Sequence, residues 1–261
     1  MTPGPKKIAV DAFLVKNGFP FEMKVASRFQ AYDFGIHQSL YYIDVITQAN
    51  REIDVIAIFY KKHKGENFNI VFPIECKFAP DPWILFSSLT KGFPVCYTHS
   101  RPAAQWIIHL AGVSNWDSFF EVKRNIGYGI TVADKKDNAY EGIQKLLGFL
   151  KSEQKYHRFA NSNDHTIYIP IIALRGQLFK AQLDQDEKIQ TEEIEEAQVF
   201  YKEDLEGVIP KIHIVTESHL EDYIRQLVGD CNRLFIEPYI KDRFLEEYSP
   251  QSRCLVWFPK R

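Results

Sequence analysis

Three runs of apolar and β-branched residues follow one another in the first third of the chain and predict three consecutive strands. They cover residues 36–47, 52–61 and 68–78, and short polar breaks at 48–50 and 62–67 separate them. Strand-like runs joined by short polar segments are typical of a β-meander. The pattern therefore predicts three neighbouring strands of one sheet.

Helical periodicity precedes and follows these strands. A short helix is expected over residues 8–16, ended by Asn17 and Gly18. A second is expected over residues 21–32, where apolar residues recur every three or four positions. The strongest helical pattern in the chain covers residues 136–159. Its apolar face is formed by Ile143, Leu146, Leu147 and Leu150.

A dense apolar run at residues 166–174 predicts a further strand after this helix. The order helix, three strands, helix, strand favours an α/β or α+β fold in which helices pack on a mixed sheet. Residues 83–128 are rich in aromatic residues and interrupted by Gly and Pro. We interpret them as an insertion, at about 80–130, with a helix near 103–111.

The last third of the chain has a weaker pattern. Residues 183–206 are acidic, although 197–201 and 212–215 each predict a strand, and 219–228 predicts a helix. No stretch rich in Pro, Gly or Ser marks a linker to an independent domain. We therefore expect residues 1–180 to form the core and residues 181–261 to form an extension packed on it.

Composition narrows the class of protein. Of the 261 residues, 45% are hydrophobic and 25% charged, as in an ordinary soluble domain. No apolar run approaches the roughly 20 residues of a membrane span, and the N-terminus lacks a signal-peptide core, so we expect a cytoplasmic protein without membrane contact. The four cysteines lack zinc-site spacing. With a net charge of −2, any nucleic-acid surface must be local.

Charged residues interrupt two of the predicted strands. Asp54 lies in the run 52–61, and Glu75 and Lys77 lie in the run 68–78. Because strand side chains alternate between faces, Glu75 and Lys77 project together and Cys76 points the other way. Buried charges require ion pairs, hydrogen bonds or a metal. Two carboxylates and an ammonium on neighbouring strands suit a divalent metal acting on a phosphodiester.

This pattern resembles the PD-(D/E)XK nuclease superfamily, which includes restriction endonucleases and junction-resolving enzymes. Asp54 is followed 21 positions later by Glu75-Cys76-Lys77, and Glu22 lies on the preceding predicted helix. The resemblance covers about residues 19–174. It implies a restriction-endonuclease-like core.

The resemblance also implies roles for individual residues. Asp54 and Glu75 correspond to the metal-binding carboxylates, and the carbonyl oxygen of Cys76 to a backbone metal ligand. Lys77 corresponds to the lysine that orients or activates the attacking water, and in its protonated form it could instead stabilise charge on the phosphorane. Glu22 corresponds to a glutamate near the metals. The implied cofactor is Mg²⁺ or Mn²⁺, which bind oxygen ligands.

Two features depart from the family pattern. Ile53 stands where proline often precedes the metal-binding aspartate. Pro73 lies within the strand that carries Glu75, although proline lacks a backbone donor and normally occupies strand edges, starts or bulges. The second departure predicts an irregular strand at this point.

The implied activity is a metal-dependent endonuclease that hydrolyses DNA, with restriction, defence or repair as its setting. Double-stranded DNA is the expected substrate, and cutting both strands would favour a homodimer because one site serves one strand. Two other hypotheses stay open: a non-catalytic nuclease-fold module that binds nucleic acid or a protein, and a structural domain whose charges only pair. The basic run at residues 61–64 either contacts phosphates or forms a solvated hairpin tip.

Overall fold

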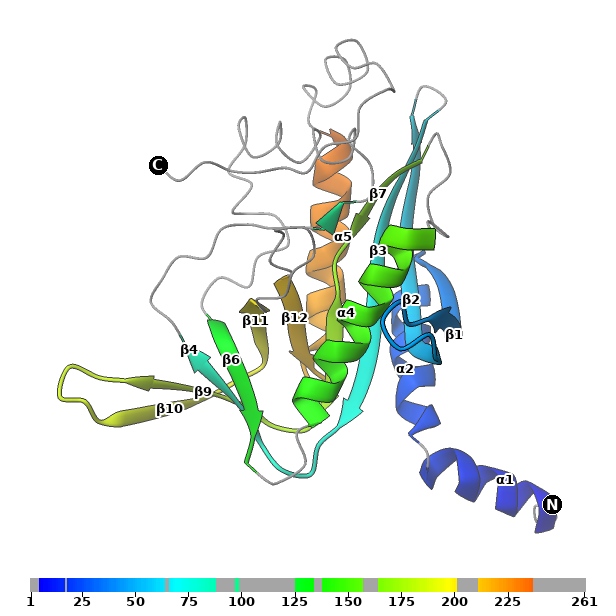
Figure 1. The fold of residues 1–261 in the computed structure, drawn as a ribbon. Coiled ribbons are helices and arrows are strands. Elements are labelled where there is room, and N and C mark those ends of the chain that lie inside the picture. Colours follow the sequence, from blue (N-terminus) through cyan, green and yellow to red (C-terminus); the bar gives the residue numbers. More distant parts are fainter. Residues whose placement is uncertain are drawn as a thin grey trace.

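The computed structural model describes eight segments of the chain. They are residues 5–16, 18–63, 66–87, 97–98, 125–133, 138–156, 164–200 and 211–236. Together they contain four helices and one twelve-stranded mixed sheet, so the protein has a mixed α/β fold (Figure 1). Within these segments, no helix combines the length and apolar character needed to span a membrane. The helix expected near residues 103–111 lies outside the described residues.

The helices are α1 (Pro5–Lys16), α2 (Phe19–Gln30), α4 (Asn138–Tyr156) and α5 (Leu220–Ile236). The first six strands are β1 (Gly35–Ile43), β2 (Asn50–His63), β3 (Glu66–Phe78), β4 (Trp83–Ser87), β5 (Tyr97–Thr98) and β6 (Ile126–Val132). The others are β7 (Asp164–Tyr168), β8 (Ile171–Arg175), β9 (Leu178–Leu183), β10 (Ile189–Ile194), β11 (Glu196–Phe200) and β12 (Lys211–Thr216).

The sheet is built outward from the meander β1-β2-β3, whose strands pair antiparallel in sequence order. Strands β7 and β8 both pair parallel with β3, and β12 pairs parallel with β8. The remaining order is β11-β6-β4-β9-β10. Strand β12, from the last third of the chain, therefore lies in the middle of the sheet.

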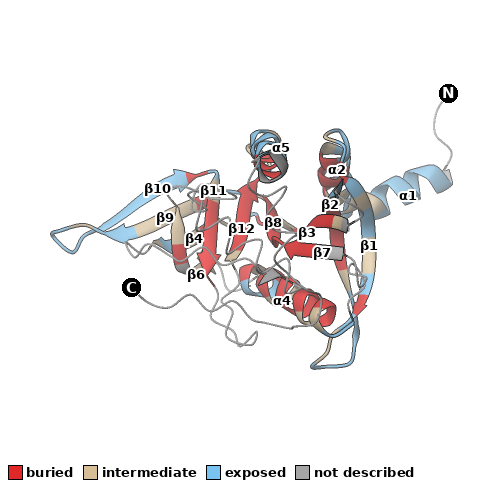
Figure 2. Ribbon diagram, turned by 90° about the horizontal axis from the view of Figure 1, so that it is seen from above, coloured by how far each residue is buried: buried red, intermediate tan, exposed pale blue. Residues whose placement is uncertain are grey.

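Helices cover both faces of the sheet at its β1-β2-β3-β8-β12 end. Helices α2 and α5 lie on one face and α4 lies on the other (Figure 2). The buried side chains form one cluster under α2 and α5 and a second under α4. In β3, Ile70, Phe72 and Ile74 belong to the first cluster and Val71 to the second, as alternation requires.

Two prolines lie near the centre of the sheet, and only one of them interrupts a strand. Strand β3 is continuous through Pro73, which pairs with Ile56 of β2, so the irregularity predicted for β3 is wrong. The interruption falls instead in the next strand. The single strand expected over 166–174 is split into β7 and β8 around Pro170, because this residue has no N–H to donate to a ladder.

Strand β1 is shorter than the sequence predicts and ends at Ile43. Asp44 then begins the connection to β2, because its Oδ1 accepts hydrogen bonds from the amides of Ile46 and Thr47, both at 2.9 Å. Gln48 adopts a left-handed conformation with a φ of 56°. Polar side chains that bond nearby amides favour turns over strands, which explains the early end of β1.

The hairpin of β9 and β10 was not predicted from the sequence. The facing residues Leu178 and Ile194 are buried, whereas Leu183 and Ile189 at the other end are exposed. The hairpin projects away from the helices (Figure 2). A strand pair that buries so few side chains shows little alternation of apolar and polar residues.

We expect the core beneath α4 to be sensitive to the loss of buried apolar atoms. Leu146 is fully buried there, so Leu146→Ala should lower the free energy of unfolding by about 2–5 kcal/mol through lost burial and a residual cavity. Ile8 on α1 is mostly exposed, and Ile8→Ala should change it by about 0.5 kcal/mol or less. Urea unfolding followed by circular dichroism measures both values. Similar losses in the two variants would contradict this view of the core.

Candidate functional site

Asp54 and Glu75 lie side by side at the point where the ladder between β2 and β3 stops. The last residue pair of that ladder is Val55 with Ile74. One residue further, Asp54 Oδ2 accepts a hydrogen bond of 2.7 Å from the backbone amide of Cys76. The carboxylate thus accepts the hydrogen bond that a backbone carbonyl of the neighbouring strand would otherwise accept. Both acids are buried, with exposures of 8% for Asp54 and 1% for Glu75.

The alternation of side chains between the two faces of the sheet is interrupted in β2 at the same point. Ile53 packs in the cluster under α4 and Val55 in the cluster under α2 and α5, although residues two apart in a regular strand share a face. On β1, Ser39 lies between the partners of these two residues and has a φ of 52°. Such a conformation is unfavourable for a residue with a side chain. The strand irregularity therefore coincides with Asp54.

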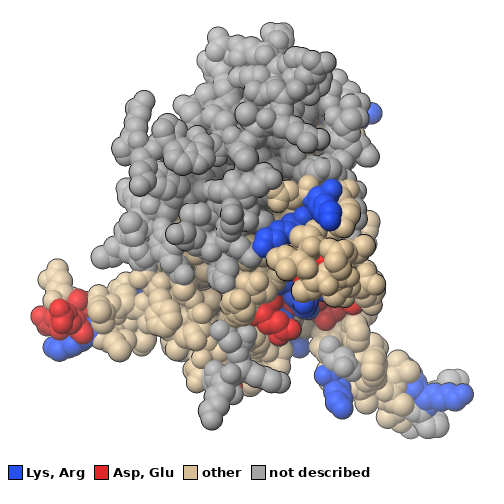
Figure 3. Space-filling view, viewed as in Figure 1, with Lys and Arg blue, Asp and Glu red and all other residues tan. Residues whose placement is uncertain are grey.

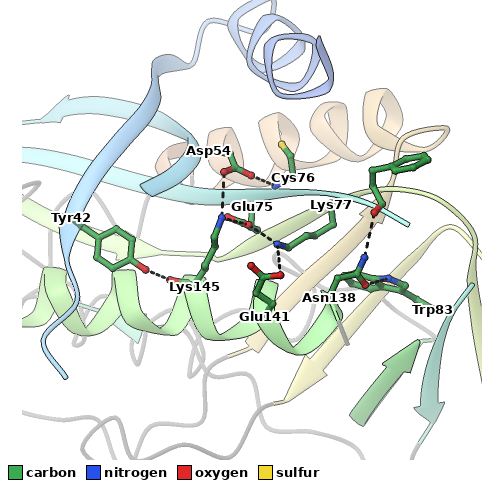
Figure 4. Close-up of polar contacts among 10 residues, drawn as sticks. Tyr42, Asp54, Glu75, Cys76, Lys77, Trp83, Asn138, Glu141 and Lys145 are labelled. Atoms are coloured by element: carbon green, nitrogen blue, oxygen red, sulfur yellow. Dashed lines mark hydrogen bonds and ion pairs between the residues drawn. The ribbon is translucent and has the colours of Figure 1, made fainter. Parts of the chain in front are cut away.

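Two lysines from different elements neutralise the acids (Figure 4). The Lys77 ammonium lies 2.9 Å from Glu75 Oε1 and 3.7 Å from Glu141 on α4. The Lys145 ammonium, also from α4, lies 2.7 Å from Glu75 Oε1 and 3.8 Å from Asp54 Oδ1. Two positive charges thus face two buried negative ones, which is the condition for burying such groups.

Helix α4 lies close enough for these contacts because small residues face the sheet. A β-carbon at Gly142 would lie 3.1 Å from Lys77 Cε, and one at Gly148 would lie 3.1 Å from the Tyr42 hydroxyl. That hydroxyl donates a 3.0 Å hydrogen bond to the backbone carbonyl of Lys145. Residues 142, 145 and 148 are spaced to line one side of the helix. The two glycines thus bring Lys145 onto the site.

The beginning of α4 is held by side-chain hydrogen bonds to the sheet. Asn138 donates to the carbonyl of Phe78 at 3.3 Å, and its Oδ1 accepts from the Trp83 indole at 3.0 Å. Phe78 ends β3, only one residue after Lys77. These bonds fix the position of the helix relative to the strand that carries Glu75 and Lys77.

Burial shifts the proton affinity of the acids. Burial, followed by the negative charge of Asp54, raises the pKa of Glu75 to about 7 despite the two lysines. Burial also raises the pKa of Asp54, against the opposing effects of Lys145 and the Cys76 amide. Burial acts to lower the pKa of Lys145, but the charges of Glu75 and Asp54 outweigh it and leave that pKa raised. The two acids therefore hold protons more tightly than exposed carboxylates do, and Lys145 is favoured in its charged form.

One oxygen of this site is left without a partner. Glu75 Oε1 faces both ammonium groups, whereas the buried Oε2 has no hydrogen-bond partner within the segments that the structure describes. A buried acceptor without a donor is unfavourable and is rare in native proteins. Carboxylate oxygens, together with backbone carbonyls, are the ligands that Mg²⁺ takes. The donor chemistry of Asp54 and Glu75 therefore fits such a cation.

The structure assembles only part of the predicted ligand set. Glu22 on α2 is close enough to influence the site: burial, then the charges of Asp54 and Glu52, raise its pKa to about 7. Nevertheless, the described residues include no group of three or more His, Cys, Asp or Glu that could hold a metal. Asp54 and Glu75 meet, and Glu22 does not complete a cluster with them.

Cys76 lies as the alternation predicts. Its side chain packs against the cluster under α2 and α5, opposite Glu75 and Lys77. Burial, with the nearby charges of Asp54 and Glu75, raises the pKa of the thiol well above its ordinary value. The partly buried thiol is thus held in its neutral form, and this residue contributes to the site through its backbone.

Lys145 and Glu141 were not predicted as site residues. The hydrophobic pattern of α4 was interpreted only as a core helix, and a lysine beside an apolar face is ordinary there. The usable signal is the spacing Gly142, Lys145, Gly148, which leaves a lysine flanked by small residues on one side of a buried helix. This spacing places Lys145 at the site only because α4 packs over β2 and β3.

Comparison of the chain with protein-family models, with curated proteins and with solved structures gave no match. The residues of the site and the order of the elements are therefore the only basis for a function.

The raised pKa of Glu75 predicts how stability depends on pH. Between its ordinary value of 4.5 and about 7, the folded protein keeps a proton that the unfolded chain has released. The free energy of unfolding must therefore fall as the pH rises through this window, with the full contribution present below it. In metal-free protein, Glu75→Gln should reduce this fall in the free energy of unfolding. A smaller fall should remain, because the pKa of Glu22 is also raised to about 7.

Urea unfolding at pH steps from 4 to 8 measures the slope. Asp222→Asn, which removes an exposed carboxylate on α5 away from this cluster, is the matched control and should leave the slope unchanged. An identical slope in wild type and Glu75→Gln would contradict the assignment of the shifted proton to Glu75.

Proposed function

We propose that this protein is a metal-dependent endonuclease of the PD-(D/E)XK type that hydrolyses DNA phosphodiester bonds. One observation carries the proposal: two buried carboxylates on adjacent strands, Asp54 and Glu75, meet with Lys77 on the same strand as Glu75. The element order supports it as well. Helix α2, the meander β1-β2-β3, helix α4 and strands β7 and β8 follow the order expected for a restriction-endonuclease-like core.

Asp54 and Glu75 would hold Mg²⁺ or Mn²⁺, with the carbonyl oxygen of Cys76 as a third ligand and Glu22 reaching the ion through water. In a strand, the N–H and the C=O of one residue point to the same side. The Cys76 amide points toward Asp54, so its carbonyl lies on that side as well. When bound, such an ion polarises a phosphate and lowers the pKa of a bound water. Waters and phosphate oxygens commonly complete its coordination.

Lys77 would orient or activate the attacking water. Its ammonium lies against Glu75 and its stem against α4 at Gly142, so its position is well defined. From there it can donate a hydrogen bond to a water or to a phosphate oxygen. A group held in place by packing and ion pairs needs little reorganisation during the reaction.

A purely structural role for these charges is the main competing hypothesis. Ion pairs with Lys77 and Lys145 account for Glu75 Oε1. They leave Oε2 without a hydrogen-bond partner in the described part of the chain, and they leave the pKa of Glu75 near 7. Replacing a buried ion pair by apolar residues is often neutral or stabilising, so structure alone is a weak reason for this arrangement. A ligand or substrate role accounts for the unused oxygen.

The DNA-binding surface is expected to be local. On the face seen in Figure 3, Lys and Arg form small separate groups, and acidic side chains lie between some of them. Lys61 and Lys62 are exposed near the far end of β2, seven and eight residues from Asp54. At about 3.3 Å per residue, that is roughly 25 Å from the acids. Phosphates contacted there would lie beyond the scissile one.

The decisive test is cleavage of supercoiled and linear plasmid DNA in Mg²⁺, Mn²⁺ or EDTA. Wild type should nick or linearise DNA only with a metal. Asp54→Asn should abolish cleavage because a metal ligand is lost. Lys77→Met should slow it by about 10²-fold to 10⁴-fold, the range for a residue that assists proton transfer. Product ends and strand polarity, read by gel analysis, identify the substrate class.

The matched control is Asp222→Asn, which removes an exposed carboxylate on α5 and should retain full activity. Cleavage that persists in Asp54→Asn would overturn the proposed site. DNA binding without cleavage by folded wild type, with either metal, would instead support the non-catalytic nuclease-fold module. A gel-filtration measurement of mass, with and without DNA, tests the expected homodimer.

A further inference from the structure

Lys145 occupies an unusual position between the two acids. Its ammonium is 2.7 Å from Glu75 Oε1 and 3.8 Å from Asp54 Oδ1, so one cation contacts the carboxylates of two strands (Figure 4). Lys77 differs, since its second acidic contact is Glu141 on the helix. Among the described ion pairs, Lys145 is thus the cation shared by Asp54 and Glu75.

A divalent metal held by Asp54 and the free Oε2 of Glu75 would lie beside the Lys145 ammonium, which already contacts Asp54 Oδ1 and Glu75 Oε1. An ammonium and a metal ion repel each other, and the repulsion is strong at a buried position where water screens poorly. The two cations therefore cannot both remain in close contact with both carboxylates. Either the metal stays out or the ammonium moves away.

We infer that Lys145 is an internal counter-cation that competes with the metal. In metal-free protein its ammonium neutralises Asp54 and Glu75, and the metal binds by displacing it. This inference rests on the proposed metal site. It goes beyond that function by assigning Lys145, a residue outside the D…ExK pattern, to the control of metal binding.

The surroundings of the two lysines explain why Lys145 is the one that moves. The Lys145 side chain is 25% exposed and the Lys77 side chain 11%. Lys77 is confined against Gly142, where a β-carbon would lie within 3.6 Å of both its Cγ and its Cε. Lys145 is held through its backbone carbonyl by Tyr42, which leaves the four-carbon stem able to change rotamer. The helix can therefore stay in place while the ammonium leaves.

The first experiment measures Mn²⁺ binding to the full chain by isothermal titration calorimetry at pH 7.5. Lys145→Gln removes the competing charge, and we expect Mn²⁺ to bind about 10-fold more tightly than to wild type, within the usual range for coupled ligands. Lys155→Gln is the matched control, because it removes an exposed lysine ten residues further along the same helix. Its affinity should equal that of wild type.

Three results are distinguishable. Tighter binding by Lys145→Gln supports the competition. Equal or weaker binding by this variant, with wild type binding Mn²⁺, overturns the competition and leaves the metal site standing. Absence of Mn²⁺ binding by both proteins overturns the metal site of the proposed function and the competition with it.

A second measurement uses wild type alone, so it does not depend on how the variant folds. Acetylation of lysines by a water-soluble acylating reagent, read by peptide mass spectrometry, reports whether each amine is engaged. Saturating Mg²⁺ should increase the labelling rate of Lys145 several-fold and leave that of Lys155 unchanged. An unchanged or lower rate at Lys145 would overturn the competition.

Discussion

The burial of two carboxylates beneath helix α4 is the constraint on which the rest of this site depends. Asp54 and Glu75 come from neighbouring strands and lie on the sheet where a helix covers it. Their charge must be matched, and Lys77 and Lys145 match it from the strand and from the covering helix. The packing of α4 on the sheet therefore also supplies the charge that neutralises the two acids.

The backbone around Asp54 is adapted to this arrangement. The ladder between β2 and β3 stops one residue before the acid, and the freed Cys76 amide donates to its carboxylate. Ser39 in the left-handed region and the interrupted alternation between Ile53 and Val55 occur at the same level of the sheet. Local strain of this kind persists where the surrounding structure enforces it, and it is common at functional sites.

The balance of charge in the site gives the proposed chemistry its physical basis. With two lysines present, burial still raises the pKa of Glu75 to about 7, and one of its oxygens lacks a hydrogen-bond partner in the described segments. The two lysines therefore do not offset the full cost of burying the charge of Glu75. The proposed metal would neutralise this charge, and in our inference Lys145 is the group that it displaces.

The sequence by itself determined the meander, a buried helix within residues 136–159 and the shared face of Glu75 and Lys77, because side-chain periodicity is a local property. It also identified Asp54 as the partner across the strands. Only the tertiary structure decided that β12 lies in the middle of the sheet, that Pro170 rather than Pro73 interrupts a strand, and that Lys145 reaches both acids. These features depend on which distant segments pack together, and a lysine on a helix acquires its role only from the surface that the helix covers.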